Sequence, residues 1–286
     1  GAKRTARESL DDRAREENNF AILFFIRYKI NKMITIKTKE EIEILKEGGK
    51  ILADVLRELA KLAKPGVSTG FLNQKAREMI LARDAEPAFE NYHPSFLDKP
   101  YPAALCASLN EVVVHGLPSE KIILKDGDIL KLDLGVKYKN LFTDAAITIG
   151  IGKLTEEKQK LVDITKQALE LAIKEVKPRN HIGDIGFAIE NYVESNGFYV
   201  IEILVGHGVG HSIHEEPNVP NYGKKGRGPI LKPGMVLAIE PMVSLKGKDV
   251  QLSKDGFGYE TLSGSLSAHF EHSVAVTESG NLVLTE

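Results

Sequence analysis

Apolar residues recur at helical spacing over residues 38–62, and this spacing predicts an amphipathic helix. Thr38 followed by Glu41 has the pattern of a capping box at the helix start. Pro65-Gly66 is typical of a helix stop. A second helix is expected over about 68–83.

Alternating and continuous apolar runs occupy much of 103–152 and predict antiparallel strands. The same order then restarts with a helix capped by Thr155, a second helix near 184–196, and strands from Phe198. Helices grouped before strands, twice over, favour an α+β fold over a doubly wound sheet.

The restart divides the chain into two related halves, about 38–152 and 153–286. We expect one catalytic domain over 33–286 built from these halves. Residues 1–32 differ from the rest: a highly charged segment precedes an apolar run that is too short to span a bilayer. We expect them to be an N-terminal extension, a cloning remnant or an over-long start, with an extra helix packed on the core as the alternative.

Two ten-residue stretches, 124–133 and 231–240, nearly repeat each other, with four identical positions and three more of the same chemical type. Each predicts a tight turn at glycine and then a buried strand that carries an acid, Asp133 or Glu240, into the interior. A buried carboxylate is costly unless a cation or hydrogen-bond donors meet it. Two acids at equivalent positions therefore suggest a shared metal site near a pseudo-twofold axis.

Composition narrows the function classes. The formal net charge is −2, which does not indicate a nucleic-acid or membrane surface. Cys106 is the single cysteine, so the chain has no intrachain disulfide and no cysteine-based zinc site. This favours a reducing compartment, and we expect the protein to be cytoplasmic.

Further acids and histidines lie in apolar or glycine-rich surroundings. Thr143-Asp144 falls on the strand after Asp133, Gly206–Pro217 carries three histidines among glycines, and Glu271 lies in a strand pattern near the C-terminus. Glycines at such positions let the backbone and a ligand approach each other closely.

Taken together, these motifs resemble type I methionine aminopeptidases from Met33 to the end of the chain. The matching blocks are Asn110–Gly116, Lys131–Gly135, Thr143-Asp144, Gly206–Pro217, Ala238–Val243 and Ser265–His272. The resemblance implies the pita-bread (creatinase/aminopeptidase) fold. In that fold an antiparallel sheet has pseudo-twofold related halves, and helices cover its outer face.

The resemblance also implies a dinuclear site for two divalent metal ions. In the family pattern Asp144 and Glu271 bridge the metals, Asp133 chelates one of them, and His207 and Glu240 bind the other. Four carboxylates would neutralise two divalent ions, and water between such ions becomes hydroxide near neutral pH. An oxygen-rich set with one imidazole is compatible with Co, Mn, Fe or Zn.

The implied activity is co-translational removal of the N-terminal initiator methionine from nascent polypeptides, by attack of metal-activated hydroxide on the first peptide bond. Glu240 would also act as general base. His115 and His214 would position the scissile amide and stabilise the oxyanion or the leaving amine. The expected methionine pocket consists of Tyr101, Cys106, Ile213 and Phe257.

The resemblance further implies one structural monovalent cation, Na or K, near Asn110, Val112 and Ser267. The expected partners are nascent polypeptide N-termini, with transient ribosome contact as a further option for the basic loop 224–227. Nucleic-acid and membrane partners are not expected, and the protein is expected to be a monomer. The remaining histidines are expected to be supporting or solvent-facing residues and not ligands: His93, His181, His211, His269 and His272.

Two alternatives remain. The Xaa-Pro aminopeptidase or prolidase type shares the fold and ligand set, but it usually carries a large N-terminal domain that residues 1–37 are too few to form. A non-enzymatic binding protein on the same scaffold is disfavoured because residues that can bind metal occupy all five ligand positions.

Two other subtypes of the enzyme are also disfavoured. The type II enzyme is disfavoured because the short span from His214 to Glu240 leaves no room for its helical insertion. The eukaryotic type I zinc-binding extension needs cysteines that this chain lacks.

Overall fold

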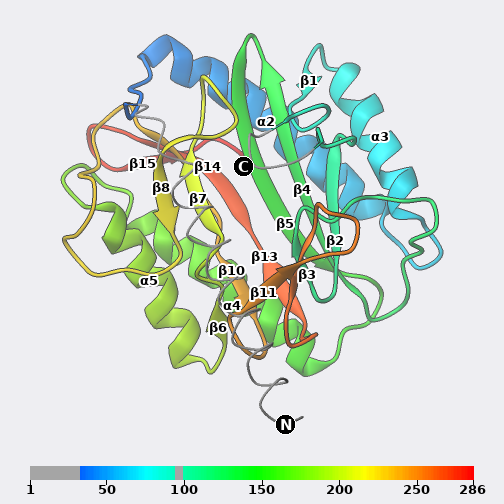
Figure 1. Ribbon diagram of the computed structural model, residues 1–286. Helices are drawn as coiled ribbons and strands as arrows, with labels where there is room; N and C mark the ends of the chain where they lie inside the picture. The colour runs from blue at the N-terminus through cyan, green and yellow to red at the C-terminus, as the bar shows by residue number, and fades with distance from the viewer. Residues whose placement is uncertain (1–32, 94–98) are drawn as a thin grey trace, which may run out of the picture.

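One large antiparallel sheet organises the fold (Figure 1). The structure is a computed structural model that describes residues 33–93 and 99–286. Within these residues nine strands form the sheet, in the order β1-β4-β5-β14-β9-β7-β8, with β2 paired to β4 and β15 to β14. Two further sheets of three strands have the orders β13-β10-β6 and β11-β12-β3. The strands of the large sheet are β1 (Glu86–Pro87), β2 (Leu105–Leu109), β4 (Ile129–Tyr138), β5 (Leu141–Gly150), β7 (Val205–Gly208), β8 (Glu215–Pro220), β9 (Val236–Ile239), β14 (Glu271–Val276) and β15 (Asn281–Val283). The smaller sheets contain β3 (Val112–Val114), β6 (Tyr199–Val200), β10 (Met242–Ser244), β11 (Val250–Leu252), β12 (Tyr259–Thr261) and β13 (Ser267–His269).

In the part of the chain that the structure describes, four helices cover the sheet, and their starts follow the capping signals in the sequence. Their bounds are α2 (Lys39–Leu62), α3 (Thr69–Leu81), α4 (Glu156–Lys174) and α5 (Ile182–Ser195). The predicted capping box is confirmed, because the Thr38 hydroxyl accepts from the Glu41 N–H and the Glu41 carboxylate accepts from the Thr38 N–H. Ser68 and Thr155 accept in the same way at the starts of α3 and α4.

The two halves have separate helical layers. Helix α2 packs on β4 and β5 and is followed by α3, whereas α4 and α5 pack together on the other half (Figure 1). Leu52, Leu56 and Leu132 lie in the first apolar core, and Ile189 and Leu237 lie in the second. The α+β architecture and the helical cover expected from the sequence are therefore present.

The two repeated stretches fold alike. Gly127 and Gly234 have φ values of 83° and 88°, in the left-handed region that favours glycine. Strand β4 then begins at Ile129 and strand β9 at Val236, two residues after each glycine. The predicted turn and buried strand are confirmed in both halves.

The sequence pattern near the C-terminus differs in one respect. A single strand was expected around Glu271, but the strand is interrupted at Phe270, between β13 and β14, which belong to different sheets.

The expectations for residues 1–32 lie outside the described residues. Among the residues that are described, no helix combines the length and apolar character needed to cross a membrane.

The packing of α2 predicts that Gly49→Ala destabilises the fold. A Cβ at this position would lie 2.1 Å from the main-chain oxygen of Leu284, which follows β15. Helical Gly→Ala changes normally stabilise by about 0.5–1 kcal/mol, but forced overlap in a packed interior costs about 1–3 kcal/mol. We expect urea denaturation to show a free energy of unfolding lower by about 2 kcal/mol.

Gly280→Ala is the matched control, because no heavy atom lies within 4 Å of a Cβ built there. Its free energy of unfolding should stay close to that of the wild type. An unchanged or higher value for Gly49→Ala would show that α2 can move away from the C-terminal segment at no cost.

Candidate metal and peptide site

Strand register brings three acids to one face of the large sheet. Asp133 on β4 lies opposite Ala146 on β5, and Ala146 lies opposite Glu271 on β14. Asp144 precedes Ala146 by two residues and therefore points to the same face. The acids are nearly inaccessible to solvent, and a segment more than a hundred residues away in sequence contributes one of them.

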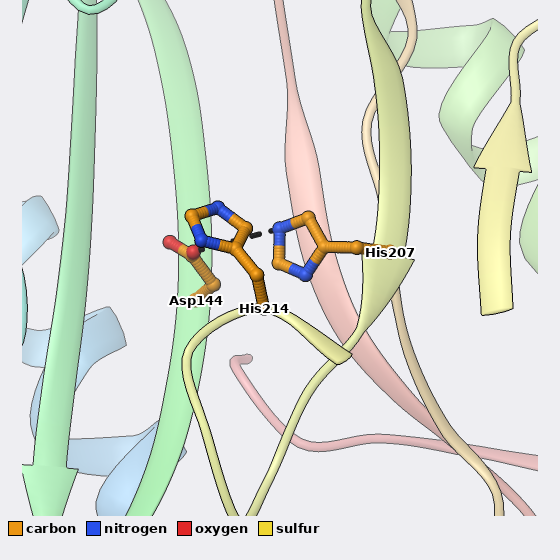
Figure 2. Close-up of side chains that lie close together, drawn as sticks. All are labelled: Asp144, His207 and His214. Carbon is orange, nitrogen blue, oxygen red and sulfur yellow. Dashed lines mark ion pairs between the residues drawn. The ribbon is translucent and has the colours of Figure 1, made fainter. Parts of the chain in front are cut away.

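The second half of the chain adds a histidine and another acid. His207 on β7 lies opposite Ala238 on β9, and Glu240 follows Ala238 by two residues. His207 Nε2 lies 3.9 Å from Asp144 Oδ2 and 3.7 Å from Glu240 Oε1. Figure 2 shows His207 and Asp144 directed toward each other from β7 and β5, with the His214 ring beside them.

All five predicted ligands thus gather in one cluster. Three overlapping groups have potential ligand atoms that all lie within 4.8 Å of one another: Asp133, Asp144 and Glu271; His207, Glu240 and Glu271; and Asp144, His207 and His214. His214 was not predicted as a ligand, and its Nδ1 lies 2.8 Å from the hydroxyl of Tyr92. That contact leaves only Nε2 of His214 available for another role.

Buried oxygens without partners indicate that a cation fits this cluster. Asp133 Oδ1, Asp144 Oδ1 and Glu271 Oε1 are buried and have no hydrogen-bond partner within the described structure. Buried carboxylates of this kind are costly unless a cation meets them. His207 Nδ1 lies 2.9 Å from the Gly208 carbonyl and can donate to it, which directs the lone pair of Nε2 toward the acids.

The electrostatics of the cluster agree with this interpretation. Burial raises the pKa of Asp133 and of Glu240 to about 7. Burial, and next the neighbouring carboxylates, raise the pKa of Asp144 and of Glu271 well above their ordinary values. Without a cation, the acids can share this space only if some of them hold protons. The donor set therefore fits one or more divalent ions.

The two predicted non-ligand histidines lie beside the cluster as neutral imidazoles. Burial lowers the pKa of His115 to about 4 and that of His214 well below its ordinary value. The rings of His207 and His214 have centroids 4.3 Å apart at 66°. Tyr92, which orients His214, was missed because it lies in an irregular segment without a recognisable motif.

His269 lies beside the cluster as a supporting residue, which is one of the two roles expected for it. It is buried and not solvent-facing, and its Nε2 lies 3.2 Å from Glu240 Oε2. Burial lowers its pKa to about 4. His269 therefore packs against a predicted ligand and general base, although it belongs to none of the three ligand groups. The break at Phe270 hid this contact, because residues 269 and 271 belong to different sheets.

The other histidines have supporting contacts or lie at the surface. His211 Nε2 lies 2.7 Å from Glu41 Oε1, and His272 Nδ1 lies 2.9 Å from Thr285 Oγ1. His181 Nδ1 lies 3.7 Å from Asp184 Oδ2 at the start of α5, and His93 is exposed.

A buried ion pair fixes the loop that carries His214. The Lys37 ammonium lies 2.6 Å from Glu215 Oε2, and both side chains are nearly inaccessible to solvent. The other carboxylate oxygen of Glu215 accepts from the backbone N–H groups of His211 and Ser212. Burial favours the neutral form of Glu215, but the hydrogen bonds from Lys37 and Thr35 outweigh it and lower the pKa. No sequence pattern predicts this pair, because Lys37 and Glu215 are far apart along the chain.

The four residues predicted to line a pocket lie together. Tyr101, Cys106, Ile213 and Phe257 belong to one buried apolar cluster, to which the structure adds Phe89. The rings of Tyr101 and Phe257 pack edge to face with centroids 5.4 Å apart. This cluster reaches the acids, because Cys106 on β2 lies opposite Asp133 on β4. Burial raises the pKa of the Cys106 thiol, which agrees with a buried apolar role and not with a nucleophile.

The predicted monovalent cation does not fit this chain. Lys131 Nζ donates to the main-chain oxygens of Asn110 and Ser267 and to the Ser267 hydroxyl, at 2.8, 3.3 and 3.3 Å. The oxygens expected at this site already have a donor. The sequence prediction failed because nothing in the motif shows that Lys131 turns toward these residues.

Comparison with known proteins shows which chains this one is similar to. The model of metallopeptidase family M24 matches residues 43–278. A methionine aminopeptidase from Aquifex aeolicus is 45% identical over 257 residues, which are 88% of this chain and 99% of the relative. A crystal structure of methionine aminopeptidase from Thermotoga maritima is 44% identical with a TM-score of 0.86, over 89% of this chain and 100% of that chain. The prolidase from Pyrococcus horikoshii, at 23% identity and a TM-score of 0.71 over 89% of this chain and 64% of its own, shares the fold alone.

The raised carboxyl pKa values predict a metal affinity that depends on pH. Ligands must lose their protons to bind a metal, and two of these acids have a pKa of about 7. We expect the affinity for Mn²⁺ to rise about tenfold or more per pH unit between about pH 5.5 and 7.5. Calorimetry in buffers of different ionisation enthalpy should show that each binding event releases protons.

The metal-free protein should show the opposite trend in stability. Because these pKa values are raised in the folded state, the stabilising contribution of the protonated acids is complete below about pH 4 and is lost as the pH rises through about 7.

For the calorimetric experiment, a Mn²⁺ affinity that is independent of pH, with no proton release, would contradict a carboxylate-rich metal site.

Proposed function

Because the chain belongs to metallopeptidase family M24, we propose that it is a type I methionine aminopeptidase that removes the initiator methionine from nascent polypeptides. Its fold is the pita-bread fold of that family. The observation that carries the proposal is the set of buried carboxylate oxygens without partners, beside His207 and next to a buried apolar cluster. The acids would hold metal, and the apolar cluster would receive the side chain of the substrate.

The proposed ligands divide between two divalent ions. Asp144 and Glu271 would bridge them, Asp133 would hold one, and His207 and Glu240 would hold the other. When bound, such ions supply a water that is acidic near neutral pH and polarise the carbonyl of the scissile bond. The oxygen-rich donor set suits Co, Mn, Fe or Zn.

Three side chains would move or position protons during hydrolysis. Glu240 has a pKa of about 7, close to the working pH, which is the property required of a general base. His115 and His214 are neutral, so each can offer one N–H to the developing oxyanion or to the leaving amine. The Tyr92 contact at Nδ1 of His214 leaves Nε2 for this task.

The apolar cluster supplies the specificity. A methionine side chain is unbranched and polarisable, and it packs well between aromatic rings and a thiol. The pocket would take it between Tyr101, Phe257 and Cys106, with the free amine of the substrate near Asp133. Such an arrangement selects the first residue of a chain, because the same site recognises both the terminal amine and the side chain.

The proposal extends to cellular context. The expected substrates are nascent polypeptides in the cytoplasm, with removal during translation and transient ribosome contact through 224–227. The protein would act as a monomer. The prolidase type remains a weaker candidate, because the relative of that type shares only the fold at 23% identity, whereas the methionine aminopeptidases reach 44 to 45%.

Substrate choice tests the proposal directly. The purified protein, treated with chelator and reloaded with Mn²⁺ or Co²⁺, should release methionine from Met-Ala-Ser at least about tenfold faster than it cleaves Ala-Pro. Chromatography of the products gives both rates. Cleavage of Ala-Pro alone, or equal activity in chelator, would overturn the proposal.

Asp144→Asn tests the bridging role. The amide removes one negative charge between the metals, so we expect loss of at least one bound metal and of about a hundredfold or more in kcat. Inductively coupled plasma mass spectrometry should show a lower metal content. The rate of Met-Ala-Ser hydrolysis should fall with it. Asp163→Asn, an exposed acid on α4, should retain both values. Near-wild-type metal content and rate in Asp144→Asn would remove this residue from the site.

A further inference from the structure

Lys131 has one of the most deeply buried side chains in the described structure. It is 1% exposed, and within residues 33–93 and 99–286 no salt bridge includes it. A buried cationic side chain without a carboxylate partner is costly unless other groups solvate it. Polar groups around the Lys131 amine must therefore take the place of solvent.

The hydrogen bonds of that amine all go to oxygen atoms. Its Nζ lies 2.8 Å from the Asn110 main-chain oxygen, and 3.3 Å from both the main-chain oxygen and the hydroxyl of Ser267. Main-chain carbonyl oxygens are also the groups that replace the hydration shell of an alkali cation in proteins. Three N–H groups of an ammonium match these three oxygens.

The oxygen cage is held in shape without Lys131. Asn110 has a φ of 49°, its side chain donates to Asp128 Oδ1 at 3.0 Å, and its own Oδ1 accepts from the Ile129 N–H at 3.0 Å. The Ser267 N–H donates to the Asn110 main-chain oxygen at 3.0 Å. Because these bonds do not involve the amine, the cage should persist when the lysine is shortened.

The cage also joins the large sheet to a small one. Lys131 lies on β4, two residues before Asp133, whereas Ser267 lies on β13, four residues before Glu271. Asn110 lies in the turn between β2 and β3. One nitrogen atom thus connects the segments that carry two acids of the proposed metal cluster.

We propose that the side-chain amine of Lys131 replaces a free monovalent cation in this chain, so that neither Na⁺ nor K⁺ is needed to hold these segments together. This inference rests on the contacts of Lys131 and does not depend on the proposed function. It explains why the oxygens of Asn110 and Ser267 point toward one position: that position is occupied by the ammonium group of Lys131.

Thermal unfolding in different salts tests the proposal. The wild type and Lys131→Asn are compared at pH 6 in KCl, NaCl and choline chloride of equal ionic strength. Asparagine is shorter and offers an amide oxygen, so it opens the cage to an ion. Lys131→Met fills the same space without a donor, and Lys121→Asn, an exposed lysine, controls for general salt effects.

The wild type and Lys121→Asn should have the same Tm in all three salts. In Lys131→Asn, K⁺ or Na⁺ should raise the Tm relative to choline in a saturable way, by about 3 °C at ten times the dissociation constant. Lys131→Met should be less stable than the wild type and insensitive to the choice of cation. A folded Lys131→Asn without a cation-specific rise would overturn the proposal.

The wild type provides a test that does not depend on any variant folding. Crystals soaked in thallium(I) should show no anomalous peak at the oxygens of Asn110 and Ser267. A peak at that position, or a wild-type Tm that K⁺ or Na⁺ raises above its value in choline, would show that the amine has not replaced the cation.

Discussion

The structure depends on one constraint: acids brought together on a buried face of the sheet must be compensated. Asp133, Asp144, Glu240 and Glu271 converge there, and three of them have buried oxygens without partners. Burial raises the pKa of each, and neighbouring carboxylates raise it further at Asp133, Asp144 and Glu271. Such a cluster destabilises the metal-free fold, because burying the charges is unfavourable. Binding of a cation to the acids offsets this cost, so the same cluster favours metal binding.

The surrounding fold fixes this cluster from several directions. Strand register sets which side chains share the face, and the helices of each half cover one part of the sheet. Lys131 connects β4 to β13 close to two of the acids. Lys37 and Glu215 fix the loop that presents His214. Each contact removes a degree of freedom from the site before any ligand arrives, which is the basis of preorganisation.

The duplicated halves supply the scaffold, and their differences supply the chemistry. Equivalent glycine turns precede equivalent strands, β4 and β9; Asp133 lies within β4, and Glu240 directly follows β9. Asp133, however, lies opposite Cys106 of the buried apolar cluster, whereas Glu240 contacts His207 and His269. Equivalent positions in the two repeats thus face an apolar cluster in one half and imidazoles in the other.

Local patterns in the sequence determined the helix starts, the glycine turns and the strands that bear the acids. The capping box at Thr38 is an example, because all its contacts lie within four residues. The motifs together also indicated the family and the five residues that the structure gathers in one cluster. The contacts of Lys131, His269 and Tyr92 were decided only by the tertiary structure. Their partners lie far away in sequence or across a break between sheets, and hydrophobic periodicity records which face a residue occupies but not which distant atom its side chain reaches.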